Sequence, residues 1–244
     1  MGVIPTEAGL KFNARIEIIL NELNRALDEI GYINNSISCS VSVGLSPTLI
    51  STIFPMVLKK FSLSNPSLNV YNVEGQVSEL LPSLRSGKLD FIIGTAIPAE
   101  YLSGVVQEPL FKTEFKVCAR KGHRLSRCTS LSQLQEADWF LPIMSLGQKN
   151  LLELLLFNSL DKMVMRGSKT AALQMVTTAD YLTVATKPMV RSHFLSPSIS
   201  VIPIEERLPD VEFCLFYSAD RPLTQAAKNL MDIFCSESKC YSWK

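Results

Sequence analysis

Apolar strands and amphipathic helices alternate along most of this chain, and the alternation restricts its fold more than any other feature. The first strand is predicted at residues 37–43, where apolar residues alternate with serines. Similar apolar patterns predict eight further strands. They are expected at residues 68–73, 89–93, 115–119, 138–143, 162–166, 181–185, 199–204 and 211–217.

Helices are expected between these strands. Ser46 and Pro47 fit the N-cap and first position of a helix that runs to residue 61, and Pro55 predicts a kink or a restart within it. Further helices are expected at residues 77–85, 149–157 and 169–177, at Pro188, and from Pro222 onward. Strands that alternate with helices form parallel sheets covered by helices. Two successive β-α-β-α-β blocks therefore predict an α/β protein with two similar lobes.

The first thirty residues predict a long helix with an apolar seam. No proline lies inside residues 6–30, and five apolar residues recur at intervals of four and three, the a/d spacing that packs one helix against another. They are Ile16, Leu20, Leu23, Leu27 and Ile30. Gly31 is expected to end the helix. The alternative is packing on the chain's own domain, but the position ahead of a self-contained α/β unit favours a partner helix and dimerisation.

Charge and composition narrow the function classes. The chain has 244 residues, 47% of them hydrophobic and 19% charged, with a formal net charge of +1. Phosphate contacts need clustered Lys and Arg, so we expect no DNA binding by this chain alone. Its apolar runs are far shorter than the ~20 residues of a membrane helix, and no signal-peptide pattern opens the chain. A cytoplasmic protein is therefore expected.

The cysteines and histidines predict neither a metal site nor a cofactor. The six cysteines form no C-x-x-C pair, and the only histidines are His123 and His193. A structural zinc site needs closely spaced soft ligands. Reduced, mostly buried thiols are therefore expected, with a redox-active cysteine as the alternative.

Four segments, in order along the chain, resemble the LysR-type transcriptional regulators. Residues 2–9, Gly-Val-Ile-Pro-Thr-Glu-Ala-Gly, resemble the P-T-E-A-G that closes that family's winged helix-turn-helix and opens its linker helix. Residues 89–94 resemble its L-D-x-x-I motif, and residues 120–123 its G-H-P turn, with Arg124 in place of Pro. Residues 173–188 resemble its V-x-x-G-x-G-I-x-x-L-P segment, with Asp180 in place of a customary Gly.

The resemblance covers the whole chain and implies a type 2 periplasmic-binding-protein-like fold. That fold has two Rossmann-like lobes joined by two crossing strands, here preceded by an N-terminal linker helix. Residues 1–35 would hold the end of the wing and the dimerisation helix. Residues 36–119 with 209–244 would form regulatory lobe I, and residues 120–208 lobe II. The family's DNA-binding head, a module of roughly 60 residues, would be missing.

Ligands of open α/β sheets bind beyond the carboxyl ends of the strands, where helix N-termini attract anions. Five loops meet that description, and the family's effectors sit between the lobes against the matching loops. The candidate ligand-binding residues are Ser46, Pro47, Thr48, Gln76, Thr95, Ser145, Leu146, Gly147 and Ser168. Ser46 and Ser168 also suit helix caps, and Thr95 and Ser145 ordinary turns. No Arg lies in these loops, so no Arg–carboxylate clamp is expected.

These features predict the effector-binding and oligomerisation region of a LysR-type transcriptional regulator. A small molecule, with an anion favoured by the helix N-termini, would bind between the lobes of a dimer or tetramer. DNA would be contacted only through the missing head, and no membrane is involved. One alternative is an enzyme on the same scaffold, but the sequence offers no evident nucleophile–base pair or metal site. Another is a transport-type solute receptor, which the N-terminal heptad pattern disfavours.

Overall fold

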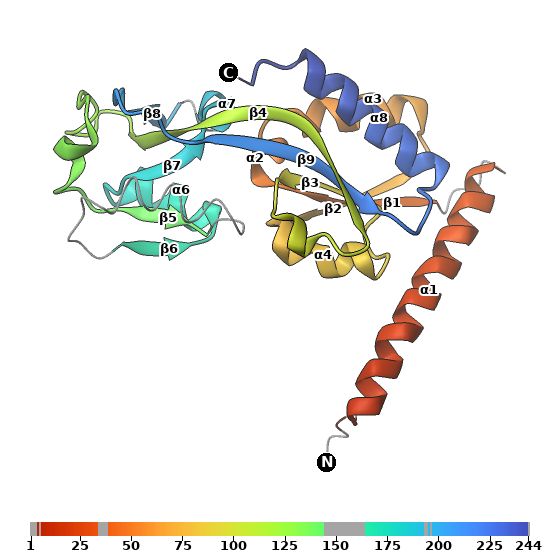
Figure 1. Ribbon diagram of the computed structural model, residues 1–244. Coiled ribbons are helices and arrows are strands. Elements are labelled where there is room, and N and C mark those ends of the chain that lie inside the picture. Colours follow the sequence, from red (N-terminus) through yellow and green to blue (C-terminus); the bar gives the residue numbers. More distant parts are fainter. Residues whose placement is uncertain are drawn as a thin grey trace.

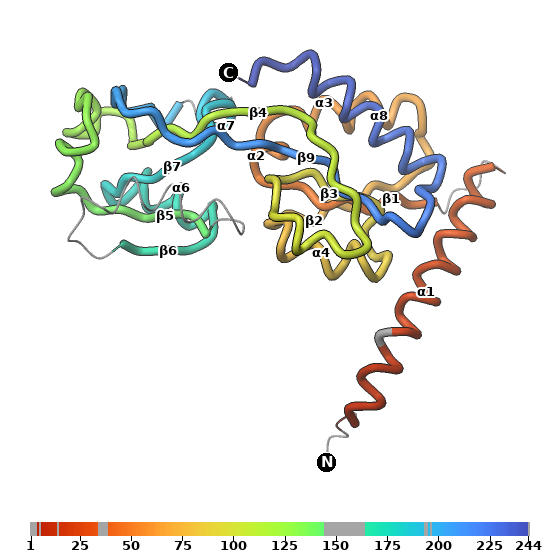
Figure 2. The backbone as a smooth tube through the Cα atoms, in the orientation of Figure 1, coloured from red at the N-terminus to blue at the C-terminus, as the bar shows by residue number. Residues whose placement is uncertain are grey.

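Two long antiparallel strands, β4 (Val105–Arg120) and β9 (Asp210–Ser218), run through the centre of the molecule (Figure 1). In this computed structural model the described residues are 4, 6–33, 39–143, 164–192, 195 and 197–243. The two strands pair from Val105 with Ser218 to Glu114 with Asp210, and the register shifts after Pro109. They connect an α/β lobe on each side, which confirms the predicted crossing strands (Figure 2).

Lobe I is built on the parallel strands β1 (Ser40–Leu45), β2 (Asn69–Glu74) and β3 (Phe91–Thr95). Strand β9 lies antiparallel beside β3. The short helix α2 (Pro47–Ile50) leads into α3 (Phe54–Ser64), and α4 (Val77–Arg85) follows β2. The last helix, α8 (Gln225–Cys240), packs beside α3. Pro55 therefore marks a restart, as predicted.

Helices cover both faces of the lobe I sheet, and this explains why β3 is apolar throughout. Phe91 and Ile93 pack in one buried cluster with Phe61 of α3 and Phe234 of α8. Ile92 points to the opposite face, into a second cluster formed with α4. Successive side chains of a strand alternate between faces, so a strand buried on both sides reads as a continuous apolar run.

Lobe II contains a two-stranded parallel sheet, β5 (Phe140–Pro142) and β6 (Met165–Gly167), followed by α6 (Lys169–Thr178). Strands β7 (Thr183–Thr186) and β8 (Ile199–Val201) pair antiparallel with β4, and α7 (Lys187–Arg191) follows β7. Two 3-10 turns, η1 (Ala99–Tyr101) and η2 (Leu131–Leu134), complete the described elements. The predicted lobe boundaries stay a prediction, because β4 and β9 run through both lobes.

Asp180 adopts the left-handed backbone conformation that its place in the family-like segment calls for. Its φ is +58°, in the region that favours glycine. The Asp180 carboxylate pairs with Arg120, and its carbonyl accepts a hydrogen bond from His123 Nε2 (3.1 Å). The buried His123 ring also accepts from the Leu125 N–H through Nδ1. Aspartate therefore replaces the customary glycine with the help of the neighbouring 120–123 turn.

Three expectations need correction. Gly31 does not end the first helix, because α1 (Glu7–Ile33) continues through it. Strand β4 begins at Val105, not at residue 115, so the irregular stretch expected before it is part of the ladder with β9. The sheets are mixed instead of purely parallel, since β4 and β9 run against their neighbours. The helix predicted at residues 149–157 lies outside the described residues.

Candidate ligand-binding cleft

A cavity lies between the two lobes, beside the strands that connect them. The inner cavity, counted together with the solvent space at its mouth, has a volume of about 500 Å³ and takes its walls from both lobes and from β4 and β9. Its lining residues are Gln76, Thr95, Phe115, Pro142, Lys169, Ala172, Leu173, Thr183, Val184, Ala185, Thr186, Met189 and Phe213. Pockets that are mainly apolar with a few polar groups are typical of small-molecule sites.

A second, more open cavity adjoins it. This outer cavity, of about 1100 Å³, is lined by residues of α2, α3 and the end of β2 on lobe I and of α6 and α7 on lobe II. Lys169, Leu173 and Met189 line both cavities and so stand between them. A ligand in the inner cavity would therefore lie next to these three side chains.

Among the described residues, two hydrogen bonds join the lobes across the cleft. The Thr48 hydroxyl at the start of α2 lies 3.1 Å from the Thr186 hydroxyl at the end of β7. The Gln76 side-chain amide donates to the Ile143 carbonyl, also at 3.1 Å. Thr48 and Thr186 are both buried, so their hydrogen bond is shielded from water. The cleft is therefore closed by direct contacts between its walls.

Lys169 is a charged residue that the described part of the cleft does not neutralise. It is the first residue of α6 and is only partly exposed. Burial lowers its pKa to about 8, against a weaker opposing effect of the nearby Glu74. Within the described part of the chain, no carboxylate lies within ion-pair distance of its ammonium group. A cation at a helix N-terminus is also destabilised by the helix dipole. Neither the helix nor a described ion pair therefore stabilises the charge of Lys169.

The structure brings three of the predicted ligand residues to the cavities. Gln76 and Thr95 line the inner cavity, and Pro47 lines the outer one. Thr48 lies behind the wall, with its hydroxyl engaged by Thr186. The predicted residues Ser145, Leu146 and Gly147 lie outside the described residues.

The two predicted serines behave differently from each other. Ser168 caps α6, because its hydroxyl accepts from the Ala171 N–H at 3.1 Å, and it lines neither cavity. Ser46 occupies the N-cap position of α2 without capping it through its side chain. Its hydroxyl is buried and has no hydrogen-bond partner among the described residues. The expected side-chain cap at Ser46 is therefore wrong.

Lys169 and the aromatic wall residues Phe115 and Phe213 were not among the residues predicted from the sequence. The signal for Lys169 was its position, directly after the predicted loop residue Ser168 and at the unfavourable end of a helix. No local signal marks Phe115 and Phe213, which lie on the two connecting strands and meet at the cavity only through the fold.

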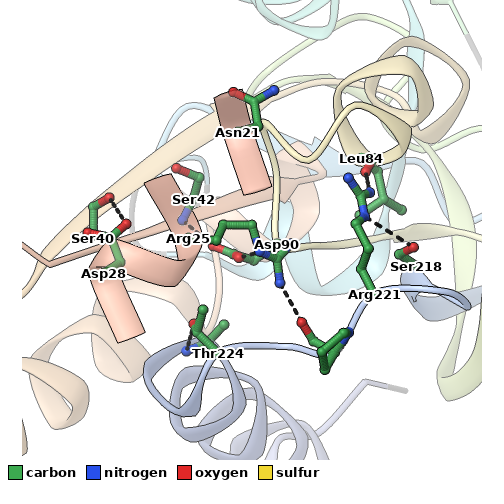
Figure 3. Close-up of polar contacts among 12 residues, drawn as sticks. Asn21, Arg25, Asp28, Ser40, Ser42, Leu84, Asp90, Ser218, Arg221 and Thr224 are labelled. Carbon is green, nitrogen blue, oxygen red and sulfur yellow. Dashed lines mark hydrogen bonds and ion pairs between the residues drawn. The ribbon is translucent and has the colours of Figure 1, made fainter. Parts of the chain in front are cut away.

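At the opposite ends of β1 and β3, a polar junction fastens α1 to lobe I (Figure 3). Arg25 Nη2 donates to the Pro222 carbonyl (2.6 Å), and Nη1 lies 3.7 Å from the Asp90 carboxylate. Asp90 also accepts from the Ser42 N–H at 2.9 Å. Both charged side chains are about nine-tenths buried. Burial raises the pKa of Asp90, and its hydrogen bond with Ser42 and the charge of Arg25 oppose that rise.

Three further contacts surround this buried pair. Asn21 of α1 donates to the Ser86 carbonyl (2.8 Å), and the Ser40 hydroxyl donates to Asp28 (3.2 Å). Lys88 forms an exposed ion pair with Glu17 (2.9 Å). In Figure 3 the side chains of Arg25 and Asp28 lie on the side of α1 that faces the strands. The polar side of α1 is thus the one that contacts lobe I.

The apolar seam of α1 lies away from that junction. Leu20, Leu23, Leu27 and Ile30 are each more than half exposed, and Ile16 is partly buried. Figure 1 shows α1 projecting from lobe I, with its N-terminal end far from the rest of the molecule. Exposed apolar residues at this spacing are typical of a helix that packs against another helix.

The cysteines differ in exposure, and two of the buried thiols are poorly suited to redox chemistry. Cys39, Cys118 and Cys214 are buried, Cys128 and Cys235 are partly exposed, and Cys240 is exposed. Burial raises the pKa of the Cys118 and Cys214 thiols to about 12. A reactive cysteine needs a lowered pKa, so these two thiols do not support the redox alternative.

Two α/β lobes joined by two strands around a cleft define a two-lobed ligand-binding protein of the type 2 periplasmic-binding-protein class. The chain matches the LysR substrate binding domain over residues 35–237. It is 32% identical over 235 residues to TdcA, an HTH-type transcriptional regulator of Escherichia coli (strain K12), covering 95% of this chain and 75% of TdcA. The chain belongs to the LysR-type transcriptional regulators.

Solved structures share the fold. The effector binding domain of QuiR in complex with shikimate has a TM-score of 0.66 and 18% identity, covering 83% of this chain and 98% of that chain. Full-length CbnR complexed with its target DNA has a TM-score of 0.69 and 15% identity, covering 97% and 84%. Within the described residues, no helix has both the length and the apolar character needed to span a membrane.

Proposed function

We propose that this chain senses a small molecule in the cleft between its lobes and carries the regulator's self-association through α1. The observation that carries the proposal is the inner cavity, whose walls come from both lobes and from the strands that join them. A ligand that contacts both walls binds the closed arrangement more tightly than the open one. It therefore shifts the lobe equilibrium by that difference in affinity.

The cavity lining favours binding over catalysis. Its described residues include no His, Cys, Asp or Glu, so it offers no pair of groups for general acid–base or nucleophilic chemistry. The QuiR domain holds shikimate, and CbnR was solved on its target DNA. By analogy with these relatives, we propose that a DNA-binding head linked to α1 contacts DNA in the cytoplasm.

A ligand screen with site mapping tests the cleft. A metabolite at about 100 times its dissociation constant should stabilise the protein by about 2.7 kcal/mol, which a thermal-shift assay detects. Hydrogen exchange with that metabolite should slow at the start of α6 and at the end of β3, with no change in the outer face of α8. Slower exchange confined to other regions would place the ligand elsewhere and contradict the proposal.

Self-association is tested on the seam. Replacing Leu23 and Leu27 together with Glu should convert dimers or tetramers to monomers in sedimentation velocity, because charges cannot be buried in a helix–helix seam. Lys11→Glu is the matched control: it changes the net charge equally, from an exposed position off the seam. Unchanged sedimentation of the double variant would show that α1 does not hold the oligomer together.

A further inference from the structure

We propose that the cleft selects a small carboxylate with a single negative charge and an apolar body, and that Lys169 binds its carboxylate group. This inference rests on the proposed function, since it concerns the same cavity. It follows from three features: the charge available in the cavity, the polar groups already engaged there, and the apolar character of the remaining walls.

Lys169 is the one charged side chain among the residues described as lining the inner cavity. It also stands between the inner and outer cavities, together with Leu173 and Met189. Its ammonium has no ion-pair partner in the described structure. Glu74, the carboxylate that lines the outer cavity, affects Lys169 only through space. One cation without a partner matches one negative charge on a ligand.

Three other polar side chains of the inner cavity form hydrogen bonds with the protein itself. The Thr183 hydroxyl donates to the Phe140 carbonyl (2.7 Å), and Thr186 shares its hydrogen bond with Thr48. The Gln76 amide donates to the Ile143 carbonyl. A ligand with many hydroxyl groups would compete with these contacts for the hydrogen-bond donors of the cavity. Unpaired polar groups are costly when buried, so the cavity disfavours such ligands.

A doubly charged phosphate fits the cavity less well than a carboxylate. Its second charge would enter a largely apolar space with no second cation among the described lining residues. The first-turn N–H groups of α6 add a partial positive charge near Lys169, which suits a single carboxylate. The remaining walls include Phe115, Phe213 and Met189, which would contact an apolar ring or chain.

The burial of Lys169 should make the cavity favour a negatively charged ligand over a neutral one. Its pKa of about 8 leaves the ammonium mostly charged at pH 7, but the surroundings do not compensate that charge. A bound carboxylate would supply the compensation and form a charge-assisted hydrogen bond. A neutral amide of the same shape would keep the apolar contacts and lose this interaction.

Matched pairs of acids and amides test the proposal. Benzoate, cyclohexanecarboxylate and 4-methylpentanoate are titrated beside their primary amides and beside phenyl phosphate, by calorimetry on the oligomeric protein. We expect at least one acid to bind, with its amide roughly 10- to 150-fold weaker, the factor that a lost charged hydrogen bond produces. Lys169→Met should weaken that acid by the same factor, and Lys169→Arg should retain binding.

Lys121→Met is the control, because it removes a lysine exposed on lobe II that lines neither cavity. Four results would each overturn the proposal. The amides could bind as tightly as their acids, or Lys169→Met could leave the binding of the acids unchanged. Phenyl phosphate could bind more tightly than every acid, or no acid could bind at all. Amides that bind in the cleft, as mapped by hydrogen exchange, would leave the proposed function intact. Ligands that map outside the cleft would contradict the proposed function itself.

Discussion

The α1 junction and the cleft lie at opposite ends of the same strands of lobe I, and they treat buried charge in opposite ways. At the junction, Arg25 and Asp90 are paired with each other and hydrogen-bonded to the backbone. In the cleft, Lys169 has a depressed pKa and no described ion-pair partner. A charge that the protein compensates itself serves the fold, whereas a charge left uncompensated in a cavity is suited to a ligand.

The same comparison indicates how the two regions are coupled. Strands β1 and β3 carry junction residues near their beginnings, and at their other ends they lead to α2 and to Thr95 of the inner cavity. Because α1 is fastened to lobe I by buried contacts, it should move with lobe I when lobe II closes on a ligand. Without the junction, cleft closure would have no fixed relation to the direction of α1.

The largest effect is expected when the junction pair is broken. Arg25→Met leaves Asp90 buried without its cation, and removing one partner of a buried pair costs about 3–5 kcal/mol. Urea unfolding of the protein measures the loss. Lys88→Met is the control, because the Lys88–Glu17 pair is about half exposed and should contribute about 0–1 kcal/mol. Equal losses in the two variants would show that the junction is no more than a surface contact.

Replacing Lys169 should change the free energy of unfolding in the opposite direction from replacing Arg25. Its folded-state pKa of about 8 lies below the ordinary 10.5, so the unfolded protein binds more protons between these pH values. Relative to Lys169→Met, the stability of the parent should therefore rise from pH 8 to pH 10.5. Below pH 8 the variant should be more stable by about 3 kcal/mol in the absence of ligand. Urea unfolding from pH 7 to 10.5 checks this, and a parent more stable than the variant at pH 7 would contradict it.

The sequence predicted lobe I well because its signals are local. Residues 77–85 form α4 as expected, and the predicted strands at 37–43, 68–73 and 89–93 each overlap an observed strand. The first half of β4 was missed because Glu108 and Pro109 interrupt its apolar pattern. That part of the strand is held by pairing with β9, about a hundred residues away in the chain. Such long-range pairing has no local signature.

The cleft was predicted less completely than the fold. The rule that ligands bind beyond strand ends selected Gln76 and Thr95, which line the inner cavity. It also selected Ser168 in place of its neighbour Lys169, because a serine before a helix suits both a cap and a ligand contact. Only the three-dimensional structure distinguishes a helix cap from a cavity residue here. The Ser168 hydroxyl accepts from the Ala171 N–H, whereas Lys169 lines both cavities.

A smaller effect is expected from the hydrogen bond between the lobes. Thr48→Val keeps the side-chain shape and leaves the buried Thr186 hydroxyl without its partner. An unsatisfied buried hydroxyl costs about 1–2 kcal/mol. Thr48→Ser retains the hydroxyl and should recover most of the loss in urea unfolding. If Thr48→Val and Thr186→Val destabilise additively when combined, the two hydroxyls do not interact.

The smallest effect is expected at Ser46, two residues away in the same loop. An N-cap serine would lose about 1 kcal/mol on replacement by alanine, but the Ser46 hydroxyl caps nothing and is 2% exposed without a described partner. Removing a buried hydroxyl that makes no hydrogen bond relieves an unpaired polar group. Ser46→Ala should therefore leave the free energy of unfolding unchanged or raise it by up to about 1 kcal/mol. A loss of 1 kcal/mol or more in urea unfolding would show that the Ser46 hydroxyl does have a hydrogen-bond partner. This part of the cleft wall would then resemble the α1 junction, where the polar groups are paired within the protein.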